Sequence, residues 1–437
     1  MAEAGGAVSA PQTLALLPWG DVIEDFLDGI GVSLETFATE MTGGWLFGYV
    51  EALRRVGVRT VIVCVSKQVC EPTCFTHGPT DATVWALPAP RSYLRLRRLM
   101  RDPYGWTVED MFGPASAPRR AVQRLIRDVA PYLAMPPRSL ARVLRDEGCD
   151  AVLCQEYEYP RFDVAVRVGR RLGLPVFATF QGGDWQTSRI ERWLRPRSLR
   201  AAAGLIIPTS TEAARVQARY GVPDAQIARI FNPLDVESWT RADRYDARRD
   251  LGFANTAAVV VWHGRVDLHR KGLDVLLDAW TEVVRVRPKR DLRLLLIGTG
   301  PSADELRVRV EADEHIHWID EYVLDRDRLR RLLATADVYA FPSRHEGFPV
   351  ALVEALASGL PVVAADAPGV PDILCPDPAC GSMVPRGEVA TFARALGDLL
   401  DDPHQATMGR AARQRAETAF SLDAVGAQLK AFLFSDR

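Results

Sequence analysis

The sequence has no apolar run long enough to cross a membrane. The longest one, Ala257–Trp262, falls far short of the roughly 18 residues that span a bilayer. The opening segment, Met1–Gln12, has neither a basic start nor a long apolar stretch, so we do not expect a signal peptide. These absences favour a cytoplasmic protein that makes at most a peripheral contact with a membrane.

Cysteine is scarce, with seven residues in a chain of 437. An odd and low number does not build a disulfide framework, so a reducing compartment fits the sequence. Cys70, Cys74 and His77 lie close together, but a fourth ligand at the usual zinc spacing is missing. We therefore favour three unrelated loop residues over a zinc site.

Neither sign of charge dominates the chain. The 54 Lys and Arg residues stand against 56 Asp and Glu residues, a formal net charge of −2. A dedicated nucleic-acid-binding protein carries a clearly basic domain, so we do not expect a nucleic acid as a partner. The apolar share of 48% supports folded cores. Since single cores stop growing at about 250–300 residues, the length predicts two domains.

Short apolar runs alternate with amphipathic helical stretches along most of the chain. The runs show little polar alternation, which is typical of parallel strands buried on both faces. Repeated strand–helix–strand units predict an α/β protein with two doubly wound, Rossmann-like domains facing each other across a cleft. We expect strands at Thr13–Leu17, Thr60–Val65, Thr83–Leu87, Ala151–Cys154, Val176–Phe180, Gly204–Pro208, Ala257–Trp262, Leu292–Ile297, His315–Ile319, Val338–Phe341 and Pro361–Ala364. We expect helices that include Trp45–Val56, Phe162–Leu172, Thr211–Tyr220 and Leu273–Val286.

The domain boundary is predicted at an Asn-Pro turn that begins at Asn232, after the strand-like run Ile227–Phe231. A charged stretch with little apolar pattern follows the turn. We place the first domain at residues 1–235 and start the second at residue 236.

One stretch of the first half, Arg91–Arg101, has five arginines among eleven residues, with apolar side chains between them. It would suit an anionic membrane surface or an acidic acceptor. A solvated helix whose apolar residues pack inward explains it as well. We favour the second interpretation, because a single short basic patch is a weak membrane signal.

Two glycine-containing segments lie where phosphate groups could bind. Gly43 and Gly44 precede a predicted helix, whose first backbone N–H groups suit a phosphate. A second segment, between a strand and a helix, offers a guanidinium fork and an ammonium group for a pyrophosphate; its residues are Gly264, Arg265 and Lys271. Taken alone, each segment is equally consistent with an ordinary turn or a solvated loop.

The most informative segment is Pro342–Pro361, which follows a predicted strand. Glu346 falls in the loop, and Glu354 falls on the helix that should begin near Pro349. In open α/β sheets ligands bind at this edge, where carboxylates can accept hydrogen bonds from sugar hydroxyls and the first helical amides can bind a phosphate. A capping residue and a solvent-facing residue are the plain alternative, but they leave a glutamate within an otherwise apolar helix unexplained.

The chain resembles the retaining glycosyltransferases of family 4, the glycogen-synthase-like enzymes with the GT-B fold. The motifs that carry the resemblance are Gly264-Arg265…Lys271-Gly272, Gly298-Thr-Gly-Pro301, Glu346-Gly-Phe…Glu354-Ala and Gly359-Leu-Pro-Val-Val. It covers Val259 to about Pro385 and extends more weakly into the first half through Gly43-Gly44 and Phe180-Gln-Gly-Gly-Asp184. It also implies that the second domain ends at residue 415 and that a helix at 416–437 packs back on the first domain.

The resemblance implies a hexosyltransferase whose second domain binds a nucleoside-diphosphate sugar and whose first domain binds the acceptor. A UDP-sugar is favoured and a GDP-sugar is the alternative; the acceptor would be a hydroxyl of a small molecule, glycan or lipid. Arg265 and Lys271 would neutralise the pyrophosphate, Glu346 would bind the sugar and Glu354 the ribose. The other implied donor-side residues are Gly43, Gly44, Gly264, Gly298, Tyr322, Val323, Gly347, Phe348, Val350 and Ala351.

We expect transfer without a metal or other cofactor, because the sequence shows no Asp-x-Asp cluster of the kind that holds Mg²⁺ with a nucleotide. Gln181 stands where the family often has His, and an amide cannot shuttle a proton. The leaving phosphate would then take the acceptor's proton. Asp184 and Trp185 are candidates for sugar or acceptor contacts.

Three further positions are candidates for acceptor contacts or differ from the family pattern. Glu156 and Tyr157 would hold a hydroxylated or amino-bearing acceptor, or merely cap a helix. Asp372 stands where the family usually has Glu.

Three alternatives stay open at this point. Gly298-Thr-Gly300-Pro-Ser-Ala303, with Asp320 twenty residues past Gly300, matches a dinucleotide fingerprint. This match favours an NAD-dependent dehydrogenase. Two points count against it: the fingerprint follows the second strand of its domain rather than the first, and Glu346 and Glu354 have no role. The others are a different GT-B enzyme, such as a sugar-nucleotide epimerase or a phosphorylase, and a non-catalytic nucleotide-sugar-binding scaffold.

Overall fold

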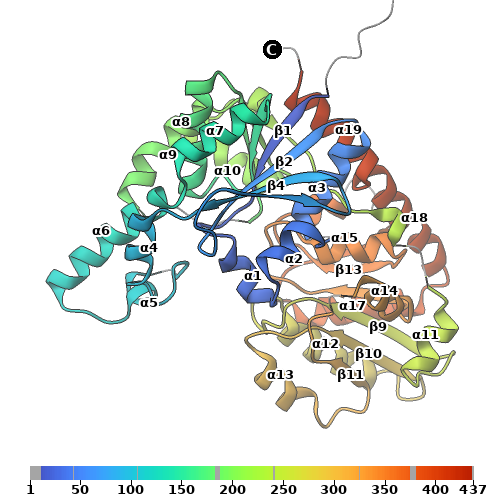
Figure 1. Ribbon diagram of the computed structural model, residues 1–437. Coiled ribbons are helices and arrows are strands. Elements are labelled where there is room, and N and C mark those ends of the chain that lie inside the picture. The colour runs from blue at the N-terminus through green and yellow to red at the C-terminus, as the bar shows by residue number, and fades with distance from the viewer. Residues whose placement is uncertain are drawn as a thin grey trace, which may run out of the picture. The chain divides into compact units, whose positions relative to one another are not determined.

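The computed structural model describes residues 11–42, 44–105, 107–182, 188–239, 242–323, 325–374 and 380–435. The chain forms two compact units (Figure 1). Unit 1 comprises Met1–Pro208, Glu212–Ile230 and Val425–Arg437, and unit 2 comprises Thr209–Thr211 and Phe231–Ala424.

The change of unit comes at Phe231, five residues earlier than the predicted boundary at residue 236. Leu234, Val236 and Trp239 are buried in the core of unit 2, and the Leu234 N–H donates to the Phe420 carbonyl at 2.7 Å. The Asn-Pro turn therefore belongs to unit 2. Residues 416–424, predicted as part of the returning helix, also belong to unit 2.

Unit 1 contains an eight-stranded sheet with the order β3-β4-β2-β1-β5-β6-β7-β8, in which only the β3–β4 pair is antiparallel. Its strands are β1 Thr13–Leu17, β2 Arg59–Ser66, β3 Thr73–His77, β4 Ala82–Pro88, β5 Ala151–Cys154, β6 Val176–Thr179, β7 Gly204–Ile206 and β8 Ile227–Ala228. Its helices are α1 Glu24–Ile30, α2 Leu34–Thr39, α3 Gly44–Arg55, α4 Arg91–Arg97, α5 Val108–Phe112, α6 Ala117–Ala134, α7 Pro137–Asp146, α8 Pro160–Leu172, α9 Arg189–Ala201, α10 Ser210–Tyr220 and most of α19 Leu422–Leu433.

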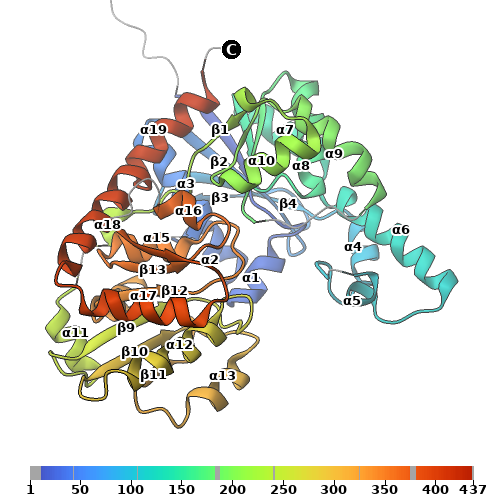
Figure 2. The same cartoon turned by 180° about the vertical axis from the view of Figure 1, so that it is seen from behind.

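Both faces of this sheet are buried. Along β1, Leu14 and Leu16 join one core cluster, whereas Ala15 and Leu17 join the other. Helices α8 and α9 lie side by side over one face (Figures 1 and 2). Burial on both sides is why these strands read as continuous apolar runs in the sequence.

Unit 2 contains a six-stranded, all-parallel sheet with the order β11-β10-β9-β12-β13-β14. Its strands are β9 Ala258–His263, β10 Leu292–Ile297, β11 Ile316–Ile319, β12 Val338–Phe341, β13 Val362–Ala365 and β14 Gly381–Val384. Its helices are α11 Arg244–Asp250, α12 Leu273–Arg285, α13 Ala303–Val310, α14 Arg326–Ala334, α15 Val350–Ala357, α16 Val370–Leu374, α17 Val389–Asp401 and α18 Gln405–Ala419. The predicted pair of Rossmann-like domains is confirmed.

Two strands escaped the sequence analysis. β3 is an antiparallel edge strand whose residues are partly exposed, and β14 begins Gly-Ser-Met with only its last residue buried. Neither strand is buried on both faces, so neither gives an apolar run.

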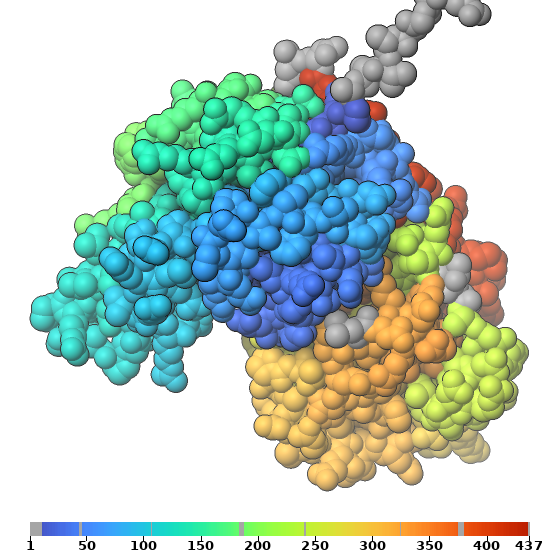
Figure 3. All heavy atoms as spheres, in the orientation of Figure 1, coloured from blue at the N-terminus to red at the C-terminus, as the bar shows by residue number. Residues whose placement is uncertain are grey.

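The arginine-rich stretch after residue 90 forms α4 and a turn. Tyr93 is fully buried, Leu94 and Leu96 pack against the core of unit 1, and Arg97 pairs with Asp25 at 2.9 Å. Leu99, just beyond, is exposed. This segment and α6 project from unit 1, and Figure 3 shows their surface. The arrangement supports the inward-packing interpretation for most of the stretch.

Helix α19 packs within unit 1. Val425, Leu429 and Leu433 belong to the core cluster that also contains residues of α3. Gly426 permits this close approach, because a Cβ there would lie 2.3 Å from the Ala52 carbonyl oxygen. No helix among the described residues is long and apolar enough to cross a membrane.

Candidate functional site

The strand order of unit 2 reverses direction between β9 and β12. In open α/β sheets, ligands bind in the crevice outside the carboxyl ends of the strands at such a topological switch point. The chain leaves β9 at Gly264 and leaves β12 at Pro342. Two of the motifs singled out in the sequence therefore meet at the place where a ligand is expected.

The loops after these two strands are held together by the backbone. The Arg344 N–H donates to the Arg270 carbonyl at 3.0 Å. Gly272, the N-cap residue of α12, has φ +67°, and a Cβ there would lie 2.0 Å from the Pro342 carbonyl oxygen. Only glycine permits this contact, so the glycine before α12 sets how closely the loops approach.

An ion pair joins the two loops across the switch point. The Lys271 Nζ donates to both carboxylate oxygens of Glu346 at 2.9 Å, and the Ser343 hydroxyl donates to one of them. The Glu346 side chain is 8% exposed and that of Lys271 is 26% exposed. The sequence proposed both residues but not their contact, which links positions 75 residues apart.

Arg344 anchors the same loop from the outside. It forms an ion pair with Asp274 on α12 and donates to the His269 carbonyl. Burial acts to raise the pKa of Asp274, but the hydrogen bonds and charge of the Arg344 guanidinium, together with the Val275 N–H and His269, lower the pKa overall. The loop that carries Glu346 is thus fixed at both ends.

Arg265 differs from its neighbours in having no partner. Its side chain is exposed, and no hydrogen bond or ion pair engages it within the part of the chain that the structure describes. An unpaired guanidinium two residues beyond β9 is available to a phosphate, for which its planar fork of donors is well suited.

Glu354 is held by a residue that the sequence analysis did not single out. The carboxylate of Glu354, on α15, accepts a hydrogen bond from Nε2 of His263, the last residue of β9, at 2.9 Å. His263 is 7% exposed, and its Nδ1 has no partner among the described residues. Its place at the end of the strand next to the glycine motif was the signal that could have identified it.

The start of α15 offers backbone donors beside the ion pair. The first N–H groups of a helix lack intrahelical acceptors, and that of Ala351 is among them. The Val350 N–H, predicted as a donor to ligand, is already bonded to the Phe348 carbonyl at 2.9 Å. The Phe348 ring packs near Phe231 and Phe420, so only its backbone could face a ligand.

The glycines of the possible dinucleotide fingerprint have a packing role. A Cβ on Gly298 would lie 1.9 Å from the Gly264 carbonyl oxygen, and one on Gly300 would lie 2.4 Å from that of Val266. Asp320, the proposed ribose-binding acid of the dehydrogenase reading, pairs with Arg307. The fingerprint is therefore explained by the fit between the loops after β9 and β10.

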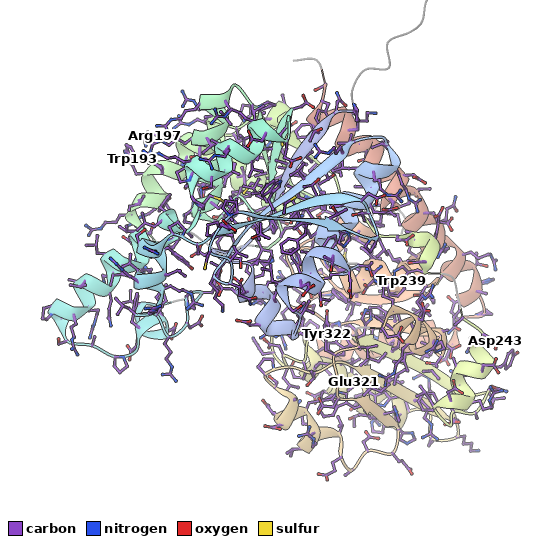
Figure 4. All side chains as sticks on the ribbon, viewed as in Figure 1. Trp193, Arg197, Trp239, Asp243, Glu321 and Tyr322 are labelled. Atoms are coloured by element: carbon purple, nitrogen blue, oxygen red, sulfur yellow. The ribbon has the colours of Figure 1, made fainter. Side chains whose placement is uncertain are left out.

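Tyr322 and Val323 lie in the loop after β11, where Figure 4 labels Tyr322 and its neighbour Glu321. Tyr322 is 66% exposed, whereas Val323 packs against the core of unit 2. Glu321 pairs with Arg328. Tyr322 is thus the residue of this loop that remains available for a flat ligand.

Three predicted site residues of unit 1 lie outside the described residues: Gly43, Asp184 and Trp185. Others are described. Gly44 is the first residue of α3. The amide of Gln181 donates to the Thr179 hydroxyl at 3.1 Å, and its backbone N–H donates to the Glu156 carboxylate at 3.0 Å.

Glu156 and Tyr157 have internal partners rather than a free face. Glu156 is 1% exposed, has φ +80°, and accepts backbone hydrogen bonds from Glu158 and Gln181. Tyr157 is fully buried, and its hydroxyl donates to Glu212. Of the two uses foreseen for this pair, the structural one accounts for both side chains, and they play no part in the proposals below.

Other predicted positions are also engaged. Both ring nitrogens of His77 have partners, the Thr80 hydroxyl and the Met41 carbonyl. No group of three or more His, Cys, Asp or Glu suited to a metal occurs among the described residues. Asp372 accepts hydrogen bonds from the N–H and hydroxyl of Ser210. The statement that the sequence has no Asp-x-Asp pattern was wrong, because it contains Asp325-Arg-Asp327. Asp325 caps the start of α14, and Asp327 pairs with Arg330.

Two Rossmann-like units with a polar switch-point site define the chain as a protein of the GT-B fold. Solved structures share this fold along nearly the whole chain. The Anabaena protein HepE, solved in complex with UDP, matches with a TM-score of 0.65 at 17% identity over 97% of this chain and 99% of that one. Sucrose-phosphate synthase from Thermosynechococcus elongatus matches with a TM-score of 0.63 at 18% identity over 96% of this chain and 97% of that one.

The family follows from the sequence models. Residues 47–238 match the model "Glycosyltransferase Family 4", and residues 257–402 match "Glycosyl transferases group 1". Together the two matches cover more than three quarters of the chain. The chain belongs to the family 4 glycosyltransferases, as the motifs predicted.

Curated relatives resemble about half of the chain. A GDP-mannose-dependent monoacylated alpha-(1-6)-phosphatidylinositol monomannoside mannosyltransferase of Corynebacterium glutamicum is 32% identical over 46% of this chain and 55% of its own length. An MMP alpha-(1->4)-mannosyltransferase of Mycolicibacterium hassiacum is 30% identical over 56% of this chain and 58% of its own. A D-inositol 3-phosphate glycosyltransferase of Nocardia farcinica is 33% identical over 45% of each chain. The chain thus spans about half the length of the curated relatives it matches.

Proposed function

We propose that the chain transfers a hexose from a nucleoside-diphosphate sugar to a hydroxyl group of an acceptor, with retention of configuration and without a metal. The observation that carries the proposal is the ion pair of Lys271 and Glu346 at the switch point of unit 2, beside the unpaired Arg265. It brings a carboxylate for sugar hydroxyls within reach of two cations for a pyrophosphate.

The residues divide the work of holding a donor. Arg265, Lys271 and the N-terminal end of α15 offer positive charge and N–H donors to the diphosphate, which gains negative charge as it leaves. Glu354, oriented by His263, would accept hydrogen bonds from the ribose hydroxyls. Because internal contacts already fix Lys271 and Glu354, little reorganisation of these two side chains is needed when charge develops.

The proposal gives Lys271 two tasks. In the structure it neutralises Glu346; in the complex it would also face the pyrophosphate. Lys271→Ala therefore removes one cation and leaves a largely buried carboxylate next to the leaving group. The double variant Lys271→Ala/Glu346→Gln should bind nucleoside diphosphate more tightly than Lys271→Ala alone, because it lacks that repulsion.

The base of the donor is proposed from relatives only. HepE was solved with UDP, and the Corynebacterium relative depends on GDP-mannose. We keep UDP as the expected nucleotide and place GDP beside it in the first binding panel. Thermal-shift measurements with UDP, GDP, ADP and their sugars distinguish these donors, since a ligand of the native state raises the midpoint of unfolding.

The catalytic part of the proposal is tested with Glu346. Glu346→Gln should lower kcat/KM for sugar transfer while the variant still binds free nucleoside diphosphate, because that ligand lacks the transferred sugar that residue 346 would contact. Glu311→Gln, on an exposed residue, serves as the matched control. Equal losses of turnover and of nucleoside diphosphate affinity would refute the sugar-binding role, and unchanged turnover would show that Glu346 has no part in transfer. Nucleotide-sugar binding by a parent protein that transfers no sugar would favour a non-catalytic binder.

Metal independence is a separate prediction. Arg265 and Lys271 supply the positive charge that Mg²⁺ provides in many enzymes that use nucleotides. EDTA should leave the transfer rate unchanged, and added Mg²⁺ should not raise it. A rate that falls with EDTA and returns with a divalent cation would show that these two side chains are not sufficient.

A further inference from the structure

Unit 1 has its own switch point, which the sequence analysis approached only through Glu156 and Tyr157. Its strand order reverses between β1 and β5. The Gln155 N–H, directly after β5, donates to the carbonyl of Leu17 at the end of β1, so these two strand ends lie together. As in unit 2, a ligand is expected beyond them.

Gln155 has an unused side chain at this position. The residue is 1% exposed, and neither its carboxamide oxygen nor its nitrogen has a partner among the described residues. A buried amide without hydrogen bonds is costly, and native structures nearly always satisfy such groups. One oxygen and one NH₂ group side by side match a hydroxyl group, which both donates and accepts.

Arg161, in the first turn of α8, is the second unused group. It is 6% exposed, its NH2 nitrogen has no partner, and no ion pair or side-chain hydrogen bond engages it within the described ranges. A buried, unpaired charge is strongly unfavourable unless an opposite charge joins it. The guanidinium fork fits a phosphate or carboxylate, and the N-terminal end of α8 adds partial positive charge.

The guanidinium lies near the switch point. Burial raises the pKa of Asp21 to about 6, and Arg161 acts against this increase. It acts in the same way on Cys154, the last residue of β5, whose pKa burial raises to about 12. Asp21 itself has a hydrogen bond from the Tyr93 hydroxyl and forms no ion pair with Arg161.

Three half-buried aromatic residues stand at the same place. Trp19 follows β1, Tyr159 is the N-cap residue of α8, and Tyr104 lies before α5. The ring of Trp19 stacks on that of Tyr159 with centroids 6.2 Å apart, and the ring of Tyr104 meets both edge-on at 6.0 and 6.3 Å. Aromatic faces of this kind pack against the C–H face of a ring.

We propose that the switch point of unit 1 binds a phosphorylated polyol or sugar, with the phosphate on Arg161, a hydroxyl on Gln155 and the ring against Trp19, Tyr104 and Tyr159. That this ligand is the acceptor of the transfer rests on the proposed function; the binding site itself does not. A free sugar phosphate and a lipid headgroup share this chemistry.

The test compares phosphorylated probes with their parents. Calorimetry on the full chain would use D-inositol 3-phosphate against inositol, glucose 6-phosphate against glucose, and inorganic phosphate. Hydrogen bonds to charged groups are stronger than those between neutral groups. We therefore expect each phosphorylated probe to bind at least about tenfold more tightly than its unphosphorylated parent. Sedimentation with phosphatidylcholine vesicles, with and without phosphatidylinositol, shows whether the headgroup source is used.

Two variants separate binding from folding. Arg161→Met removes a buried charge, so it should abolish the preference for the phosphorylated probes. At about pH 5, where Asp21 is protonated and needs no nearby cation, the variant should not lower the melting temperature of the ligand-free protein. Gln155→Leu should weaken sugar phosphates but not inorganic phosphate. Arg142→Gln, on the exposed side of α7, is the control and should keep the preference.

The outcomes distinguish this proposal from the preceding one. Nucleoside diphosphate affinity should be unchanged in Arg161→Met, since that site is in unit 2. Equal affinities for a phosphorylated probe and its parent, or a preference that survives Arg161→Met, would overturn the proposal. A lower melting temperature of ligand-free Arg161→Met at about pH 5, where Asp21 is protonated, would also overturn it, by showing that the guanidinium has another structural partner. Sugar-phosphate binding in a protein that binds no nucleoside diphosphate would instead refute the transferase.

Discussion

Each carboxylate of the donor-side site has a partner of its own. Glu346 is held by Lys271 and Ser343, and Glu354 is held by His263. These contacts fix the side chains before any ligand arrives, so binding need not immobilise them. Arg265, by contrast, is free to move onto a phosphate.

Asp21 provides a test of buried charge in unit 1. Burial raises its pKa from 3.8 to about 6, with Arg161 opposing the shift. The folded protein therefore holds a proton that the unfolded chain loses between these values, so ionisation costs the native state stability as pH rises from about 4 to 6. At ~1.4 kcal/mol per pKa unit, the loss is about 3 kcal/mol.

Asp21→Asn should remove this loss, because an amide does not ionise. Urea unfolding at several pH values between about 4 and 7 should show a flatter stability profile for the variant than for the parent. Asp28→Asn, on an exposed residue of α1, should keep the parent profile. The assignment fails if Asp21→Asn loses as much stability as the parent over this range.

At the scale of elements, the sequence predicted strands and motifs well but not the contacts between them. The continuous apolar run from Val259 to Trp262 predicts a buried strand, because residues on both faces of that strand lie in a core. The ion pair between Lys271 and Glu346 forms because β9 and β12 are neighbours in the sheet. The order of the strands determines this, and no local sequence pattern predicts the order. Arg161 was missed for a similar reason. That it has no ion pair among the described residues can be seen only from the positions of the surrounding side chains.

Gly272 allows the loops after β9 and β12 to touch, and its replacement tests that link. Gly272→Ala places a Cβ 2.0 Å from the Pro342 oxygen, whereas Gly252→Ala, at nearly the same φ of +70°, meets no atom within 4 Å. Both should lose about 1–2 kcal/mol for the left-handed conformation. Gly272→Ala should lose more stability than Gly252→Ala, and of the two only Gly272→Ala should weaken nucleoside diphosphate binding.

Chemical unfolding and calorimetry of the two variants provide the comparison. If they lose the same stability and bind nucleoside diphosphate equally well, the close approach at Gly272 does not hold the Lys271–Glu346 pair in place.

At the scale of the whole molecule, a net charge of −2 hides a strongly basic surface on unit 1. Two adjoining grooves of about 490 and 880 Å³ lie along α7, α8 and α9. Within the described ranges, none of seven exposed arginines lining them pairs with a carboxylate: Arg138, Arg142, Arg145, Arg167, Arg170, Arg171 and Arg197. The exclusion of a nucleic-acid partner rested on the average charge alone and stays a prediction.

The return of the chain to unit 1 is a second feature of the whole molecule. Leu429 of α19 is fully buried in unit 1, so Leu429→Ala should cost about 2–5 kcal/mol. Hydrogen exchange should rise in peptides from β1 and β2 but not in those from β9 and β12. Ala431→Ser, on an exposed residue of the same helix, should change neither. Faster exchange in β9 would contradict the assignment of α19 to unit 1.

The central claim is that the switch point of unit 2 binds the diphosphate of a nucleotide sugar. Calorimetric titration of the preferred nucleoside diphosphate into Lys271→Ala and Lys289→Ala, the latter an exposed lysine of the same unit, tests it most directly. We predict that Lys271→Ala weakens binding by about tenfold or more, since it removes a cation and unmasks Glu346, whereas Lys289→Ala binds like the parent. Unchanged affinity in Lys271→Ala would contradict the account.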